Sequence, residues 1–309
     1  MSRPGRWVVL AALALAACEG GSSSRNTPVS PTPIPSAPPK VAADYRNLVY
    51  TQVPRALRLD LYTPAGAPPF PVIVWVHGGG WQSGGKSMRA DHPALRQRAR
   101  GYAVAAIEYR LSPEALFPAQ IQDCKAAIRW LRANSATYGL DQSRFAAWGA
   151  SAGGHLVSLL GTSADVTMLE AFSQGSPGFP SRVQAIVDWY GPSDFLQMDP
   201  GHEGPDSPES RLLGCPPRAC PDQVQAANPI SYIDPGDAAF FIQHGTADGT
   251  VPIVQSRLLH DALRAHGVPS TFVPIEGAGH GGSAFETPGN LALVEAFLDS
   301  MLKGERSRD

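Results

Sequence analysis

Short apolar runs that alternate with stretches of helical periodicity constrain the fold of this chain more than any other feature. The runs cover residues 72–76, 103–107, 145–148, 185–189, 240–243 and 271–275. Each is continuous rather than alternating, which is typical of strands buried on both faces of a sheet. Between them, apolar residues recur at helical spacing. Strands that alternate with helices predict a mostly parallel sheet with helices on both faces, a three-layer α/β sandwich.

The start of the folded region has a different pattern. Leu57, Leu59 and Leu61 alternate with Arg58 and Asp60. This alternation is typical of a half-buried strand. Together with the short apolar stretch before it, the pattern predicts an antiparallel hairpin that opens the sheet.

The chain has 309 residues, enough for one large domain beside a signal segment and a linker. We expect this domain over residues 44–303, followed by a polar tail over 304–309. Within it, residues 193–237 are rich in Pro, Gly and Asp and break the alternation of strands and helices. Such an insertion is either a lid or binding loop or a plain surface excursion, and both interpretations stay open at this point.

The N-terminus has the pattern of an export signal. Arg3 and Arg6 precede an apolar run over 7–17, which is too short to span a bilayer as a helix. The run ends in the letters LAAC, which resemble the lipobox of bacterial lipoproteins. The resemblance implies that residues 1–17 are a lipoprotein-type signal peptide and that Cys18 carries a lipid. Ordinary secretory cleavage just before the cysteine is the alternative.

Residues 18–43 are dominated by Pro, Ser and Gly, with too few apolar groups to offset the entropy of ordering. We interpret them as a spacer that holds the folded domain away from a membrane. Glu19 stands after the cysteine, where Asp would favour retention in the inner membrane. We therefore expect an exported lipoprotein of the outer membrane, on its periplasmic or cell-surface side.

Three further cysteines follow the spacer. Cys215 and Cys220 flank a Pro-rich tetrapeptide, and in the oxidising compartment of an exported protein they are expected to form a disulfide. Cys124 shares a helical face with Ile121 and Ile128, which indicates a buried thiol. No second Cys or His pair lies at ligand spacing, so no metal site is expected.

The letters GASAG over residues 149–153 match the motif G-x-S-x-G. They follow a buried run and precede a helical stretch, which is the strand–turn–helix context that the motif requires. The serine of this motif sits in a sharp, strained turn, so the residues two positions away cannot carry bulk. We therefore predict that Ser151 is a nucleophile exposed at the N-terminus of a helix.

The letters HGGGW over residues 77–81 follow the first buried run. Small residues there allow backbone N–H groups to approach a developing oxyanion. Gly79 and Gly80 are the predicted donors, with Ala152 as the third. Trp81 is expected to form a wall of the substrate pocket. A glycine-rich turn without a ligand is the alternative.

An acid and a base should follow the nucleophile in the order Ser, Asp, His. Asp248 comes after the run 240–243, and His280 lies in a glycine-rich loop after the run 271–275. Both positions are at the carboxyl edge of the sheet, where open α/β sheets carry out their ligand chemistry. We predict that His280 is the general base and that Asp248 orients it.

Other acids and histidines are expected to lie elsewhere. Asp234 and Asp237 precede the run 240–243, which puts them at the opposite edge of the sheet. His77 is expected to be structural, and His155 to face helix packing. The remaining histidines with no such placement are expected at the surface: His92, His202, His260 and His266.

Together, the motifs HGGGW, GASAGGHL, HGTADGTVP and GAGHGG resemble the esterase branch of the α/β-hydrolases. The branch is the hormone-sensitive-lipase-like one, and the bacterial bifunctional feruloyl and acetyl esterases are most similar. The likeness covers roughly residues 45–302, with the motifs in the right order. It implies the α/β-hydrolase fold and hydrolysis of carboxylic esters through an acyl-enzyme, without a metal or organic cofactor. It also implies the roles given above to Ser151, Asp248 and His280.

Two other functions remain as alternatives: an arylformamidase-like amide hydrolase, and a non-catalytic binding protein of the same fold. The net charge of −2 and the lack of a basic stripe argue against nucleic acid as a partner. The sequence contains no long apolar run of the kind that would indicate an acyl tunnel. We therefore expect short acyl esters as substrates, small or linked to polysaccharide, with phenolic acyl esters such as feruloyl esters as a further candidate.

Overall fold

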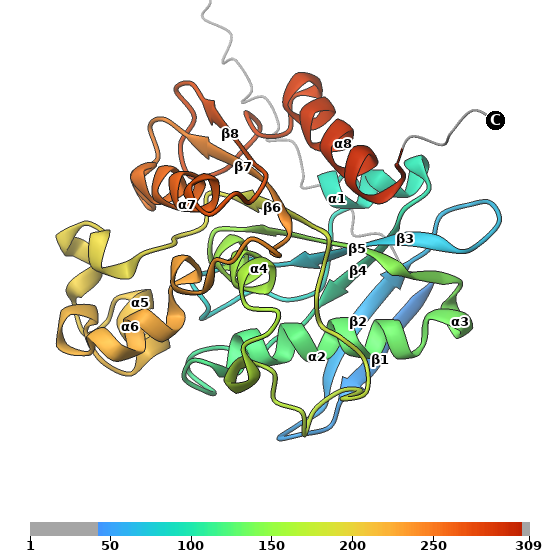
Figure 1. Cartoon of the computed structure of the whole chain (residues 1–309), viewed down its shortest axis with the longest axis horizontal. Coiled ribbons are helices and arrows are strands. Elements are labelled where there is room, and N and C mark those ends of the chain that lie inside the picture. Colours follow the sequence, from blue (N-terminus) through green and yellow to red (C-terminus); the bar gives the residue numbers. More distant parts are fainter. Residues whose placement is uncertain (1–42, 305–309) are drawn as a thin grey trace, which may run out of the picture. The chain divides into compact units, whose positions relative to one another are not determined.

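An eight-stranded sheet forms the centre of the computed structural model, which describes residues 43–304 (Figure 1). Its strands are β1 (Tyr45–Thr51), β2 (Leu57–Tyr62), β3 (Phe70–Val76), β4 (Ala103–Ile107), β5 (Leu140–Ala150), β6 (Ala185–Trp189), β7 (Ala239–Gly245) and β8 (Ser270–Ile275). They lie in the order β1-β2-β4-β3-β5-β6-β7-β8. β2 pairs antiparallel with β1 and β4, and every other pair is parallel. The predicted mostly parallel sheet with an antiparallel opening hairpin is confirmed.

Helices cover both faces of this sheet (Figure 1). On one face pack α2 (Ala119–Ala133), α4 (Ala152–Thr162) and α7 (Val254–Ala265), and on the other α1 (Pro93–Arg96) and α8 (Pro288–Leu302). The remaining helices are short: α3 (Ser135–Tyr138), α5 (Pro208–Leu213), α6 (Pro221–Ala227) and the 3-10 turns η1 (Gln97–Arg100), η2 (Thr167–Leu169), η3 (Phe195–Gln197), η4 (Pro200–Glu203), η5 (Pro217–Ala219) and η6 (Pro229–Tyr232).

Two hydrophobic cores lie between these layers, one on each face of the sheet. In β3, Val72, Val74 and Val76 belong to the core under α2 and α4, whereas Ile73 and Trp75 belong to the core under α8. Successive side chains of a strand point to opposite faces, and both faces are covered here, so the apolar run is continuous. The predicted three-layer sandwich is confirmed.

Part of the predicted domain organisation concerns residues outside this description. The expected signal peptide over 1–17, the cysteine at position 18 and nearly all of the spacer over 18–43 lie there, as does most of the tail over 304–309. Within residues 43–304, no helix combines the length and the apolar character that crossing a membrane requires.

The segment 193–237 folds into short helices rather than an open loop, comprising α5, α6 and the turns η3 to η6. Its apolar side chains join the core on the α2 and α4 face: Phe195, Leu212, Leu213, Val224 and Ala227. The insertion is therefore packed against the body of the domain, which gives its remaining side chains defined positions.

A disulfide links Cys215 to Cys220, with the two Cα atoms 6.2 Å apart. It closes the connection between α5 and α6, and Cys220 is buried. Cys124 is a free and fully buried thiol on α2, as its helical spacing predicted.

Candidate active site

The turn between β5 and α4, called the elbow below, holds Ser151 in a backbone conformation that few residues adopt. Its φ is 57° and its ψ is −122°. A Cβ atom on Gly149 would lie 2.2 Å from the carbonyl oxygen of Gly153, and one on Gly153 would lie 2.1 Å from that of Val76. Only glycine fits at both positions, so the strain at Ser151 is maintained by close backbone packing on either side.

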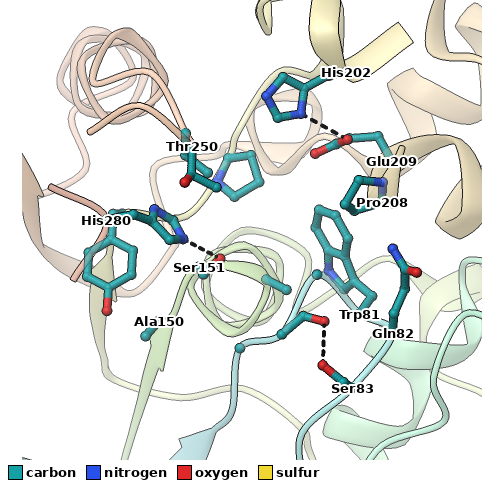
Figure 2. Close-up of a pocket in the computed structure, with 17 residues that line it drawn as sticks. Trp81, Gln82, Ser83, Ala150, Ser151, His202, Pro208, Glu209, Thr250 and His280 are labelled. Carbon is teal, nitrogen blue, oxygen red and sulfur yellow. Dashed lines mark hydrogen bonds and ion pairs between the residues drawn. The ribbon is translucent and has the colours of Figure 1, made fainter. Parts of the chain in front are cut away.

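Ser151, His280 and Asp248 form one continuous chain of hydrogen bonds. The Ser151 hydroxyl donates to His280 Nε2 over 2.8 Å (Figure 2), and His280 Nδ1 donates to Asp248 Oδ2 over 2.7 Å. Asp248 follows β7 and His280 follows β8, so parallel strands bring both loops to the carboxyl edge of the sheet beside the elbow. The structure thus brings together all three residues that the sequence singled out.

Asp248 is held as a carboxylate by a surrounding set of donors. Its side chain is fully buried. Burial by itself would raise its pKa, but hydrogen bonds from His244, His280 and the backbone N–H groups of Val251 and Thr250 hold the pKa well below its ordinary value. An ionised Asp248 at neutral pH can fix the His280 tautomer that leaves Nε2 free to accept the serine proton.

His244 is a second histidine on the same carboxylate, and no role was predicted for it. Its Nε2 lies 3.2 Å from Asp248 Oδ2 and 2.8 Å from the carbonyl oxygen of Val251, while Nδ1 lies 2.7 Å from the Ser256 hydroxyl. Since two acceptors face Nε2, that nitrogen carries the hydrogen and the Ser256 hydroxyl donates to Nδ1. A signal was present: the histidine stands four residues before the acid in the motif HGTAD.

Tyr190 contacts the other side of the catalytic imidazole. Its ring packs edge-on against His280 with centroids 4.7 Å apart. A Cβ atom on Gly281 would lie 2.7 Å from the Tyr190 hydroxyl, so the loop after His280 also needs glycine. The base is therefore oriented by packing as well as by Asp248.

The glycine loop after β3 comprises residues 77–81 and is called the oxyanion loop below. It lies directly against the nucleophile. Gly79 and Gly80 have φ of 105° and 58°, and neither N–H donates a hydrogen bond to another described residue. Ala152 is the first residue of α4, so its N–H has no partner within the helix. Gly78, which the prediction left out, approaches most closely: a Cβ atom there would lie 3.3 Å from Ser151 Cβ. The predicted oxyanion donors thus have unused N–H groups and line the same cavity as the nucleophile.

A cavity of about 580 Å³ opens above these groups. Its size suits a small-molecule site. Besides the nucleophile, the base and the oxyanion loop, it is lined by Gln82, Ser83, Tyr190, Pro192, His202, Pro208, Glu209, Thr250 and Val251. Three of these residues come from the insertion, so the binding-loop interpretation of residues 193–237 is favoured over a plain surface excursion.

Trp81 takes part in both the cavity wall and the core. It lines the cavity, as predicted, yet it is 2% exposed. Its indole N–H donates to His155 Nδ1 over 3.2 Å, and His155 Nε2 in turn donates to the carbonyl oxygen of Ala227. Burial lowers the pKa of His155 to about 4, so the imidazole is neutral and can accept the indole hydrogen. These bonds join the oxyanion loop, the elbow helix and the insertion.

Two predictions about histidines are wrong. His92 was expected at the surface, but it caps α1 by accepting from the Ala94 N–H, and burial beside Trp75 lowers its pKa to about 3. His202 was also expected at the surface, but it lies in the cavity wall, 3.0 Å from Glu209. The sequence could not place His202, because its environment exists only once the insertion has folded back over the site.

Most of the other side chains lie where they were expected. His77 is buried and stacks on Tyr109, and burial lowers its pKa. His266 is exposed, but His260 is half-buried rather than at the surface, with Nδ1 2.8 Å from the Ser270 hydroxyl. Asp234 and Asp237 form a turn before β7, where the Asp237 carboxylate accepts from the Asp234 N–H.

Within residues 43–304, no group of three or more His, Cys, Asp or Glu side chains is arranged to hold a metal ion.

The protein is similar to proteins described as esterases. Esterase LipQ of Mycobacterium tuberculosis is 32% identical over 274 residues, which are 86% of this chain and 64% of that protein. The chain spans between 55% and 64% of the length of the first curated relatives that it matches.

Two solved structures show a similar architecture. A truncated carbohydrate esterase from gut microbiota is 31% identical with a TM-score of 0.76, covering 84% of this chain and 96% of that one. A bifunctional GH43-CE protein of Bacteroides eggerthii is 34% identical with a TM-score of 0.75, covering 84% of this chain and 35% of that one. These likenesses confirm the α/β-hydrolase fold. Since the BD-FAE family model matches residues 59–263, which include the elbow, the oxyanion loop and the triad acid, the chain belongs to the BD-FAE family.

Proposed function

We propose that this protein hydrolyses carboxylic esters through an acyl-enzyme on Ser151. The observation that carries the proposal is the hydrogen-bond chain from Asp248 through His280 to Ser151, at the floor of an open cavity and beside unused backbone N–H groups. The similarity to LipQ and to the gut carbohydrate esterase supports the same activity. Neither relative is described as an amide hydrolase, so the arylformamidase alternative is not favoured.

The geometry supports a two-step reaction. His280 Nε2 takes the hydroxyl proton as Ser151 Oγ bonds to the ester carbon, and the carbonyl oxygen gains negative charge beside the N–H groups of the glycine loop and Ala152. His280 then gives the proton to the alcohol oxygen as the bond between that oxygen and the acyl carbon breaks. In the second step a water molecule gives its proton to His280 and attacks the acyl carbon. The acid is released, and the proton returns to Ser151.

Short acyl groups are the expected preference. The cavity of about 580 Å³ has to hold both halves of the ester, and polar side chains such as Gln82 and Ser83 take part in its wall. A site that buried a long chain would gain about 0.8 kcal/mol for each CH₂ group removed from water. Because the cavity has little room to bury a long acyl chain beside the alcohol half, kcat/KM for p-nitrophenyl esters should be highest for acetyl and butyryl and fall at octanoyl and palmitoyl. A higher value for palmitoyl than for acetyl would contradict this prediction.

We further propose that the protein is an exported lipoprotein anchored through Cys18. The lipobox-like letters LAAC and the spacer after them support the proposal. Wild-type protein expressed in a bacterial host with a labelled fatty acid should take up the label, and Cys18→Ser should not. If the wild type takes up no label, the anchor does not exist and export by ordinary cleavage becomes the better interpretation.

A further inference from the structure

A buried carboxylate in the insertion faces the cavity with few partners of its own. Glu209, on α5, is 3% exposed. His202 on η4 pairs with this carboxylate, with Nδ1 3.0 Å from Oε2, and no other described residue donates a hydrogen bond to it. Buried carboxylates are normally well supplied with donors, because leaving them unsatisfied is costly. The spare acceptor capacity of Glu209 therefore points to a ligand.

The pair is held in place by the turn that precedes α5. Ser207 caps this helix by accepting from the Ser210 N–H, and Pro208 stands at its first position. The Ser207 hydroxyl also donates to the carbonyl oxygen of His202 over 2.7 Å. Both side chains are thus positioned before any substrate arrives, which reduces the entropy lost on binding.

The pair lies on the side of the cavity that receives the alcohol half of an ester. His280 must reach the alcohol oxygen to protonate it, so that half lies along the wall formed by His280, Thr250 and Val251. His202 lines the same cavity as Thr250, and Figure 2 shows both residues along one side of the open space. In Figure 2, His202 and Glu209 face Ser151 across the open space.

The chemistry of the pair favours hydroxyl groups. A carboxylate beside an imidazole offers an acceptor and a donor a few ångströms apart, which matches hydroxyl groups that both donate and accept. A simple alkyl alcohol would leave Glu209 unsatisfied. A cationic group is disfavoured, because it would lie against the imidazole as well as the carboxylate. Pro208 and Trp81 lie next to the pair in the cavity wall and offer apolar surface for the C–H groups of a ring.

We propose that His202 and Glu209 form the subsite for the alcohol half of the substrate, and that this alcohol carries free hydroxyl groups as a sugar does. The inference rests on the esterase activity proposed above and adds which residues select the substrate. An alcohol that lacks the hydroxyl groups is rejected, because it would leave the buried polar pair without hydrogen-bonding partners.

The test compares two acetyl esters in wild type and two variants. One substrate is a mono-acetylated methyl pyranoside. The other is p-nitrophenyl acetate, whose alcohol half has no hydroxyl group besides the one that is esterified. Glu209→Gln and His202→Gln should each lower the ratio of the two kcat/KM values about 10- to 100-fold, the usual effect of losing a hydrogen bond to a charged group. Inhibition by the free methyl pyranoside should weaken in parallel. Glu203→Gln, in the same insertion but outside the cavity lining, is the matched control and should leave the ratio unchanged.

The outcomes separate the two proposals. If wild type hydrolyses neither ester, the proposed esterase function fails and the subsite fails with it. If wild type hydrolyses p-nitrophenyl acetate but not the pyranoside ester, or if both variants lose activity on the two esters equally, the activity stands and the subsite is overturned. The second result would mean that the pair only supports the fold of the insertion.

Discussion

Ser151→Ala is expected to lower kcat for ester hydrolysis by about 10⁶, the order found when a serine hydrolase loses its nucleophile. The hydroxyl is the atom that bonds to the acyl group, and its hydrogen bond to His280 Nε2 places it for attack. The backbone should not change, because the turn is fixed by Gly149 and Gly153 rather than by the serine side chain. Hydrolysis of p-nitrophenyl acetate by the purified variant measures the loss, and an unchanged thermal midpoint shows that the fold is retained.

The same variant also separates an enzyme from a binding protein. A fluorophosphonate probe should label the wild type once and leave Ser151→Ala unlabelled. Ser231→Ala, an exposed serine in the turn η6, is the control and should be labelled like the wild type. If the wild type itself is not labelled, the serine is not activated and the non-catalytic alternative is correct.

Asp248→Asn is expected to lower turnover by about two to four orders of magnitude, by transfer from the effect of the same change in a serine protease. The asparagine oxygen can still accept from the Thr250 and Val251 N–H groups. Its NH₂ group would then face His280 Nδ1 and force that nitrogen to accept. The hydrogen would move to His280 Nε2, which could no longer accept the serine proton. The NH₂ group would also face the Nε2 hydrogen of His244, so two donors would meet where one carboxylate oxygen now accepts.

Asp234→Asn and Asp237→Asn are the controls for this prediction. Both carboxylates lie in the turn before β7, and Asp237 serves the backbone there rather than an imidazole. Turnover of p-nitrophenyl acetate by the three purified variants decides the assignment. If Asp248→Asn keeps most of its activity while one of the other two loses it, Asp248 is not the triad acid.

The elements of the fold were largely predictable because each depends on a local pattern. The strand β3 could be found as a continuous apolar run, which is typical of burial on two faces. The hairpin strand β2 could be found as an alternation of apolar and charged residues, although the structure buries Asp60 as well and the strand is not the half-buried one expected. The triad could also be predicted, although Ser151, Asp248 and His280 are far apart in the chain. Parallel strands bring their carboxyl ends to one edge, so the position of each residue after a strand was enough.

The sequence by itself therefore determined the layers of the fold, the elbow at Ser151 and the edge at which the acid and base meet. Only the tertiary structure decided what surrounds them. That His244 shares the carboxylate of Asp248, and that His202 and Glu209 face the nucleophile, depends on how loops and the insertion 193–237 fold back over the sheet. Such contacts produce no periodic pattern in the sequence, because they join single side chains across long sequence separations and do not repeat along one element.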